Sequence, residues 1–287
     1  MKQRYVYINN KNIVLLFILF FFLLLIFIFF TPLNNSNLHW YKSKMEYFTL
    51  KDNIINTNED LIPKIIIQTW KTKNIPNNYK TDVNSLKTKN PEYKYIFFTD
   101  ADINTFLKKN YPKYFKTYNK LPVKIQKFDF FRYIAIYHYG GFYFDLDVTG
   151  LEPLDDLLTS ECIFPIDEFI NPSMCKIERY TYFCKNDLNY LLGQYAFAAK
   201  PKHPFIKLLI DTIHDNIESY IHDFNNKKYI NFEIYVYQTT GPDFVTKLYL
   251  NYINKSTIHI LEYNKRQYFG KYARHNYYGT WKKNLNN

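Results

Sequence analysis

Short apolar runs alternate along the chain with longer segments whose apolar residues recur at helical spacing. The runs are rich in isoleucine, tyrosine and phenylalanine, which is typical of buried strands. The strand candidates are 62–70, 93–100, 142–148 and 256–264. The helix candidates begin at Thr99 or Asp100, extend from about Pro122 to Gly140–Gly141, and cover 203–224. Strands that alternate with helices predict an α/β domain with a largely parallel sheet.

The N-terminal region has a different pattern. Residues 13–30 are an unbroken apolar run, close to the length that crosses a bilayer as a helix. A signal peptide would have a shorter apolar region and a small-residue cleavage site, so we favour an uncleaved anchor. Basic residues in 1–12 predict a cytoplasmic tail. The polar, asparagine-rich residues 31–60 then form a stem, and 61–287 a luminal domain.

Composition narrows the function only slightly. The net charge is +11, but the lysines are scattered and no nucleic-acid-binding motif occurs, so we expect no nucleic-acid partner. A basic surface would suit lipid headgroups or a phosphate-bearing ligand. The cysteines Cys162, Cys175 and Cys184 lack metal-site spacing; two could pair in an oxidising lumen, and the sequence does not say which. Sequons at Asn34 and Asn254 fit such a compartment.

The clearest candidate for chemistry is "GGFYFDLDVTG", residues 140–150. On a strand, Tyr143, Asp145 and Asp147 would share one face, because side chains alternate. The apolar Phe144, Leu146 and Val148 would pack in the core on the other. Two adjacent carboxylates repel each other unless a cation lies near them, and their hard oxygens suit Mg²⁺ or Mn²⁺. In Asp100–Ala101–Asp102, by contrast, a helix cap with a first-turn carboxylate is the better interpretation.

The helix before this motif carries a second unusual feature. Residues 128–139 are apolar nearly all round, which predicts burial. Asp129 and Arg132 are three residues apart and therefore neighbours on one helix face. Buried charges must pair or meet a ligand. The pair is either a structural ion pair or part of a ligand cleft beside Asp145 and Asp147, since ligands gather at the carboxyl ends of parallel strands.

Several segments together resemble glycosyltransferase family 32, the DXD-motif sugar-binding group. They are "IPKIIIQTWKT", "NPEYKYIFFTD", "KFDFFRYIAIYHYGGFYFDLDV" followed by "LEPLD", "TGP" at 240–242 and "HNYYGTW" at 275–281. The resemblance implies a GT-A fold, a nucleotide-sugar donor, a divalent cation (Mn²⁺ or Mg²⁺) and retention of anomeric configuration. Many members are type II membrane proteins of the secretory pathway, which fits the predicted anchor.

The resemblance also implies roles for individual residues. Asp145 and Asp147 would hold the metal and donor diphosphate, with His275 as a further metal ligand. Asp129 and Arg132 would contact the donor's sugar and ribose. The remaining positions are Gln194 at the donor sugar, Gln68, Thr69 and Trp70 at the nucleotide base, Tyr143 on the aspartate face, and Trp281 over the diphosphate.

The resulting hypothesis is a metal-dependent, retaining hexosyltransferase in a Golgi or ER-type membrane. We favour mannose as the sugar, from GDP-mannose, with a UDP-hexose as the other donor. The acceptor would be a lipid similar to inositol phosphorylceramide, or a glycan. Two alternatives remain. Asp145 and Asp147 also fit the Asp-x-Asp-x-Thr motif of haloacid-dehalogenase-like phosphatases, although no later metal motif of that fold is found. The chain could also be a membrane-anchored sugar-binding protein without catalysis.

Overall fold

The computed structural model describes residues 60–226, 231–263, 265–279 and 282. The chain divides into two compact units, 1–56 and 57–287, and the described residues belong to the second. The predicted tail, the predicted anchor and nearly all of the predicted stem lie outside the described residues, as does Trp281. Within the described ranges, no helix combines the length and apolarity that crossing a membrane requires.

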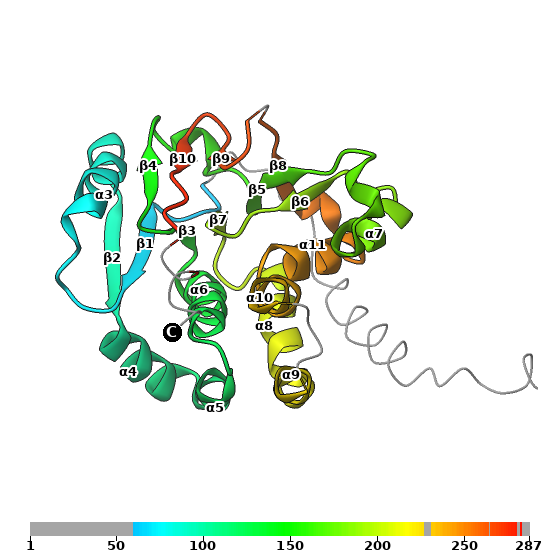
Figure 1. Cartoon of the computed structure of the whole chain (residues 1–287). Helices are drawn as coiled ribbons and strands as arrows, with labels where there is room; N and C mark the ends of the chain where they lie inside the picture. The colour runs from blue at the N-terminus through cyan, green and yellow to red at the C-terminus, as the bar shows by residue number, and fades with distance from the viewer. Residues whose placement is uncertain (1–59, 227–230, 264, 280–281, 283–287) are drawn as a thin grey trace, which may run out of the picture. The chain divides into compact units, whose positions relative to one another are not determined.

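The centre of the domain is a mixed seven-stranded sheet with the order β2-β1-β3-β7-β5-β6, to which β8 adds beside β5 (Figure 1). Its strands are β1 (Ile65–Trp70), β2 (Lys94–Thr99), β3 (Gly141–Phe144), β5 (Cys162–Phe169), β6 (Tyr190–Leu192), β7 (Ala196–Ala199) and β8 (Ile258–Leu261). Strands β1, β2, β3, β5 and β8 run in one direction, and β6 and β7 run in the other. The predicted α/β domain is confirmed. The carboxyl ends of β1, β3 and β5 lie at one edge.

A second, three-stranded antiparallel sheet has the order β4-β10-β9. It consists of β4 (Val148–Gly150), β9 (Tyr268–Phe269) and β10 (Ala273–His275). In its register His275 pairs with Val148, directly after the predicted metal motif. Segments more than a hundred residues apart in sequence are thus joined at the edge where β3 ends (Figure 1).

Helices surround the sheet, and α6 is the most enclosed of them. The helices are α3 (Asn77–Lys89), α4 (Asp100–Asn110), α5 (Pro112–Lys120), α6 (Lys124–Tyr139), α7 (Glu178–Lys185), α8 (Pro204–Asp215), α9 (Ile217–Asn225), α10 (Phe232–Thr239) and α11 (Pro242–Leu250). Three short 3₁₀ helices are η1 (Asp155–Leu157), η2 (Met174–Lys176) and η3 (Lys255–Thr257). Every residue of α6 from Asp129 to Ile136 is buried, as predicted. A helix enclosed in this way can carry charges only in fixed partnerships.

Two elements differ from the prediction. The strand expected over 142–148 ends at Phe144, because the chain turns at Asp145 and leaves the main sheet for the small one. The Val148 amide donates to the Asp145 carbonyl across this turn at 3.2 Å. The helix expected over 203–224 is divided at Asn216 into α8 and α9. The Asn216 side chain donates to the Thr212 carbonyl, a local hydrogen bond that competes with a continuing helix.

The glycine pair after α6 is required by backbone geometry. Gly140 and Gly141 have φ of +67° and +90°, a region that glycine enters without steric cost. A Cβ at Gly141 would lie 2.5 Å from the Ile65 carbonyl oxygen. The pair therefore lets the chain leave α6 and bring β3 close to β1, which aims the end of β3 at the sheet edge.

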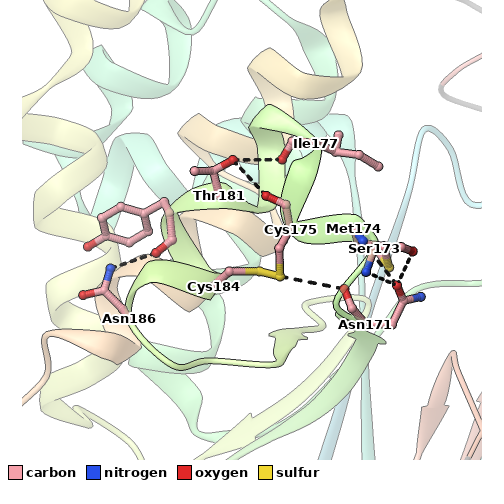
Figure 2. Close-up of a disulfide and its surroundings, with 9 residues drawn as sticks. Asn171, Ser173, Met174, Cys175, Ile177, Thr181, Cys184 and Asn186 are labelled. Atoms are coloured by element: carbon pink, nitrogen blue, oxygen red, sulfur yellow. Dashed lines mark hydrogen bonds between the residues drawn. A yellow bond between two sulfur atoms is a disulfide. The ribbon is translucent and has the colours of Figure 1, made fainter.

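A disulfide joins Cys175, which precedes α7, to Cys184 in the last turn of that helix (Figure 2). Within this loop, the Thr181 hydroxyl lies 3.2 Å from the Ile177 carbonyl oxygen and 3.4 Å from that of Cys175. Cys162 is a buried free cysteine in β5. The pairing that the sequence left open is thus Cys175 with Cys184, and it fixes the helix that carries Arg179.

Candidate active site

The Asp-x-Asp motif forms a turn anchored by buried backbone and side-chain contacts. The Asp145 amide donates to the Tyr195 carbonyl at 2.7 Å, and the Gln68 side-chain amide donates to the Asp145 carbonyl at 3.1 Å. Tyr95 in turn donates its hydroxyl to Gln68 Oε1 at 2.8 Å. The apolar residues Phe144, Leu146 and Val148 are buried as predicted. The turn therefore presents its carboxylates from a rigid base.

Asp145 is held from the side of α6. Its Oδ1 lies 3.2 Å from Arg132 Nη1 and accepts a hydrogen bond from the Tyr143 hydroxyl at 2.9 Å. The Arg132 guanidinium also lies over the Tyr143 ring, 4.6 Å from its centroid. Burial raises the pKa of Asp145, and the charge of Arg132 opposes that rise.

Asp147 is held from the C-terminal segment. Its Oδ1 lies 3.3 Å from His275 Nε2, and its Oδ2 accepts from the Tyr278 amide at 2.9 Å. His275 stacks on the Tyr195 ring with centroids 4.4 Å apart. Burial would raise the pKa of Asp147, but the hydrogen bond and charge of His275 lower it overall. Burial would lower the pKa of His275, yet its carboxylate neighbours raise it.

Asp145, Asp147 and His275 fit a divalent cation. One ligand atom from each lies within 4.8 Å of the others, which brings together two carboxylates and an imidazole. His275 Nδ1 is buried without a hydrogen-bond partner among the described residues. The two carboxylates supply the hard oxygen ligands that suit Mn²⁺ or Mg²⁺, and His275 adds a nitrogen ligand. The three predicted metal ligands are thus brought together by β3, the turn and β10.

Arg132 links this group to Asp129. Its Nη2 lies 3.2 Å from Asp129 Oδ1, and its Nη1 donates to the Gln194 carbonyl at 2.9 Å. Asp129 accepts a further hydrogen bond from Thr240 of the "TGP" segment at 2.8 Å. Burial raises the pKa of Asp129 to about 6, against the lowering effect of Arg132. The charged pair on α6 therefore faces the aspartate turn, as the second sequence interpretation expected.

A cavity of about 920 Å³ opens above the turn. This volume lies near the upper end of the about 300–1,000 Å³ usual for small-molecule sites. The predicted site residues line it, except Gln68, which is fully buried behind the turn, and Trp281, which is outside the described residues. Gln68 supports the Asp145 backbone and is shielded from the cavity by its neighbours. Its expected contact with a nucleotide base stays a prediction without structural support.

Sequence reasoning missed two further carboxylates that line the cavity. Asp167 and Glu168, at the end of β5, line it together with Arg179 and Arg266. A signal was present, because "CIFPIDEFI" has two consecutive acidic residues inside an apolar run. The argument that selected Asp145 and Asp147, two nearby carboxylates in an apolar strand, would also have selected Asp167 and Glu168. The arginines had no such signal, since α7 and residue 266 are far from the motif in sequence.

The segment that contains the Asp145–Asp147 turn is similar to a known protein family. Residues 76–164, which include the Asp145–Asp147 turn, match the family described as "Glycosyltransferase sugar-binding region containing DXD motif". The resemblance to this family that the sequence motifs predicted is therefore confirmed, and the comparison favours it over the phosphatase alternative.

Curated relatives agree with the family match. The chain is 34% identical over 195 residues to "Inositol phosphoceramide mannosyltransferase 1" of Schizosaccharomyces pombe, covering 67% of this chain and 52% of the relative. It is 35% identical over 105 residues to "Initiation-specific alpha-1,6-mannosyltransferase" of Candida albicans, covering 34% and 27%. The chain thus spans about half, or less, of the length of these relatives. The solved "PaToxG Glycosyltransferase" aligns with a TM-score of 0.45 and 17% identity over 78% of this chain and 80% of that chain, which is too low to support an argument.

Proposed function

We propose that this protein is a divalent-metal-dependent glycosyltransferase that moves a hexose, mannose in the first instance, from a nucleotide-diphosphate sugar to an inositol-phosphoceramide-like lipid. The observation that carries the proposal is the Asp145–Asp147–His275 group at the floor of a large cavity, with Arg132 beside it. The mannose and lipid parts rest on the name of the Schizosaccharomyces pombe relative. The name of the Candida relative supports a glycan acceptor as the second candidate.

The residues of the chain divide the work as follows. Asp145, Asp147 and His275 would hold the cation, which when bound stabilises negative charge on the leaving diphosphate. Arg132 is fixed between Asp129 and Asp145, so its positive charge stays beside the turn without reorganisation during the reaction. Trp70, whose ring packs at a tilt against Tyr79 with centroids 5.0 Å apart, offers an aromatic wall for the nucleotide at the end of β1.

The membrane assignment belongs to the same proposal. Residues 13–30 would anchor the chain with its N-terminus in the cytoplasm and its catalytic domain in the lumen of a Golgi or ER-type compartment. The disulfide between Cys175 and Cys184 supports an oxidising compartment, where such bonds persist. Retention of anomeric configuration is an expectation from the family resemblance.

The test is nucleotide release by the full chain, purified in mild detergent, from GDP-mannose, UDP-galactose, UDP-glucose and UDP-N-acetylglucosamine. We expect Mn²⁺-dependent release from one donor, GDP-mannose first, and its loss in Asp147→Ala. Asp102→Asn is the matched control, because that second Asp-x-Asp caps α4 through Thr99 instead of facing the cavity. No release from any donor together with hydrolysis of a generic aryl phosphate would overturn the proposal.

A further inference from the structure

The end of β5 contains a β-bulge at the cavity wall. In the pairing of β5 with β6, Ile166 is opposite Leu192 and Glu168 is opposite Leu191, so Asp167 is the extra residue. Consecutive side chains of a regular strand point to opposite faces. Asp167 and Glu168 nevertheless both line the cavity. Bulges re-aim side chains and occur often beside active sites, and here the bulge turns Asp167 towards the cavity.

The two carboxylates have different surroundings. Glu168 lies 2.9 Å from Arg266 and 3.6 Å from Arg179, and it accepts a hydrogen bond from the Tyr180 hydroxyl at 3.0 Å. Asp167 has no hydrogen bond or ion pair within the described part of the chain, although it is half-buried. The Asp167 oxygens are not among the buried unpartnered atoms of the described residues, so they remain open to the cavity. A ligand that donates a hydrogen bond can therefore pair with this carboxylate.

The position of Asp167 along the sheet edge indicates which ligand it meets. Strand β5 runs in the same direction as β1 and β3, so all three carboxyl ends face the cavity. Trp70 ends β1, the aspartate turn follows β3, and Asp167 lies beyond them at β5. The charged groups that act on Asp167 are His275, the neighbouring carboxylate of Glu168, and the arginines Arg266 and Arg179. With the nucleotide at Trp70 and the diphosphate at the turn, the β5 end is left for the acceptor.

The charges at the end of β5 favour a ligand group that is uncharged and donates a hydrogen bond. The Arg179 guanidinium is occupied by Asp243, with contacts of 2.6 and 2.8 Å. Arg266 is paired with Glu168. Both arginines therefore already have carboxylate partners, while the Asp167 carboxylate can still accept a hydrogen bond. This arrangement selects a hydroxyl rather than a phosphate or carboxylate.

We propose that Asp167 is an acceptor-binding residue: its carboxylate accepts a hydrogen bond from the acceptor hydroxyl that receives the sugar, on a polyhydroxylated ring. The proposal rests on the proposed glycosyl transfer. In that transfer the bond from the anomeric carbon to the diphosphate oxygen breaks, the bond to the acceptor oxygen forms, and the hydroxyl proton passes to the diphosphate. Asp167 orients the hydroxyl and forms no covalent bond.

The test compares two reactions of the full chain in the same preparation. One is donor hydrolysis by water, and the other is transfer to a probe acceptor. The probe is whichever of inositol phosphorylceramide in detergent micelles, myo-inositol 1-phosphate and methyl α-mannoside the wild type glycosylates fastest. The variants are Asp167→Asn and, as a matched control, Asp215→Asn, which changes an exposed carboxylate at the end of α8. Thermal unfolding is measured for both.

We expect Asp167→Asn to lower kcat/KM for the acceptor by about 10-fold to 100-fold, as for a lost hydrogen bond to a charged group. Hydrolysis and the unfolding temperature should stay at the wild-type level, as should every activity of Asp215→Asn. Equal losses of hydrolysis and transfer would assign Asp167 to the donor and overturn the proposal, as would unchanged transfer. If the wild type neither hydrolyses a donor nor transfers its sugar to any probe acceptor, the proposed function itself fails, and the acceptor assignment fails with it.

Discussion

Arg132 is the residue on which the charge balance of the site depends. Replacing it by methionine would leave Asp129 and Asp145 without their cation at one of the most enclosed points of the domain. Removing one partner of a buried ion pair costs about 3–5 kcal/mol. We therefore expect Arg132→Met to lower the free energy of unfolding by about that amount, measured by urea denaturation. Arg274→Met, at an exposed arginine, is the control. A loss below about 1 kcal/mol would show that the pair is dispensable for the fold.

Asp147 and His275 should determine metal affinity. Each supplies a ligand atom to the group, so removal leaves an incomplete donor set. Outer-sphere changes at metal sites typically cost about 10–100-fold in affinity, and we expect Asp147→Ala to cost at least that much. Calorimetric titration with Mn²⁺ measures this directly, without turnover. An unchanged Mn²⁺ affinity in both Asp147→Ala and His275→Ala would place the cation elsewhere.

For single residues, the sequence was informative where a charged residue lies within an apolar segment. Asp145 and Asp147 after an aromatic run, and Asp129 with Arg132 on an apolar helix, were selected for that reason and line one cavity. Gln68 caused no such conflict, and its assignment came from the family motif alone. Its burial behind the turn depends on Tyr95 and Asp145, which only the folded sheet brings to it.

Among the elements, α7 depends most on a covalent constraint. It is short, and the disulfide ties its last turn to Cys175, closing a loop with a sequence separation of 9. Chain-entropy estimates for loops of this size give about 2–3 kcal/mol of stabilisation. We expect Cys175→Ser with Cys184→Ser to lower the free energy of unfolding by about that amount. It should also raise hydrogen exchange in α7 more than in α6. Uniform exchange across both helices would contradict a local role.

The start of α8 provides a pH-dependent element. His203 caps this helix by accepting a hydrogen bond from the Phe205 amide through Nδ1, and it is fully buried. Burial lowers the pKa of His203 from 6.5 to about 3. Because the folded pKa lies below the unfolded one, the folded state favours neutral histidine. The stabilisation is present above pH 6.5 and is lost as the pH falls towards 3.

Between pH 7.5 and 5.5, this one group should reduce the free energy of unfolding by about 1.4 kcal/mol. His203→Asn retains a capping side chain and removes the titration. Denaturation of both proteins at the two pH values gives the difference. If His203→Asn shows the same pH dependence of the free energy of unfolding as the wild type, other groups cause that dependence.

The elements themselves were predicted where one local pattern dominates. Strands β1 and β2, helix α6 and the Thr99 cap with Asp102 at N3 follow from apolar runs and capping residues that lie together in the sequence. The turn after Phe144 could not be predicted in this way, because its backbone hydrogen-bond partners, Tyr195 and Asn276, come from distant segments. The bulge at Asp167 likewise requires the pairing with β6. Sequence periodicity carries no information on such partners.

In the whole molecule, the order of the strands brings sequence motifs that are far apart in the chain together at one candidate active site. The residues before β3 supply the Arg132 pair, β3 supplies the turn, and β10 returns from the C-terminal region with His275. The position of the turn at the carboxyl end of β3 follows from the α/β pattern, which is why the family motifs could be assigned in outline. The antiparallel β7 and the small sheet, which hold Tyr195 and His275 in place, were not predictable from that pattern.

This assembly predicts linked binding of metal and nucleotide. The cavity joins Trp70 at the end of β1 with the metal group at the end of β3, so a nucleoside diphosphate can contact both at once. A ligand present at about 100 times its Kd stabilises the folded state by about 2.7 kcal/mol. For a domain of this size that corresponds to a rise in Tm of roughly 5–10 °C. We expect this rise with Mn²⁺ and the matching nucleotide together, and a much smaller one with either alone. Thermal unfolding of the full chain with GDP and with UDP identifies the base. If Mn²⁺ and nucleotide together raise the Tm of Asp147→Ala as much as that of the wild type, the prediction that metal and nucleotide binding are linked is wrong.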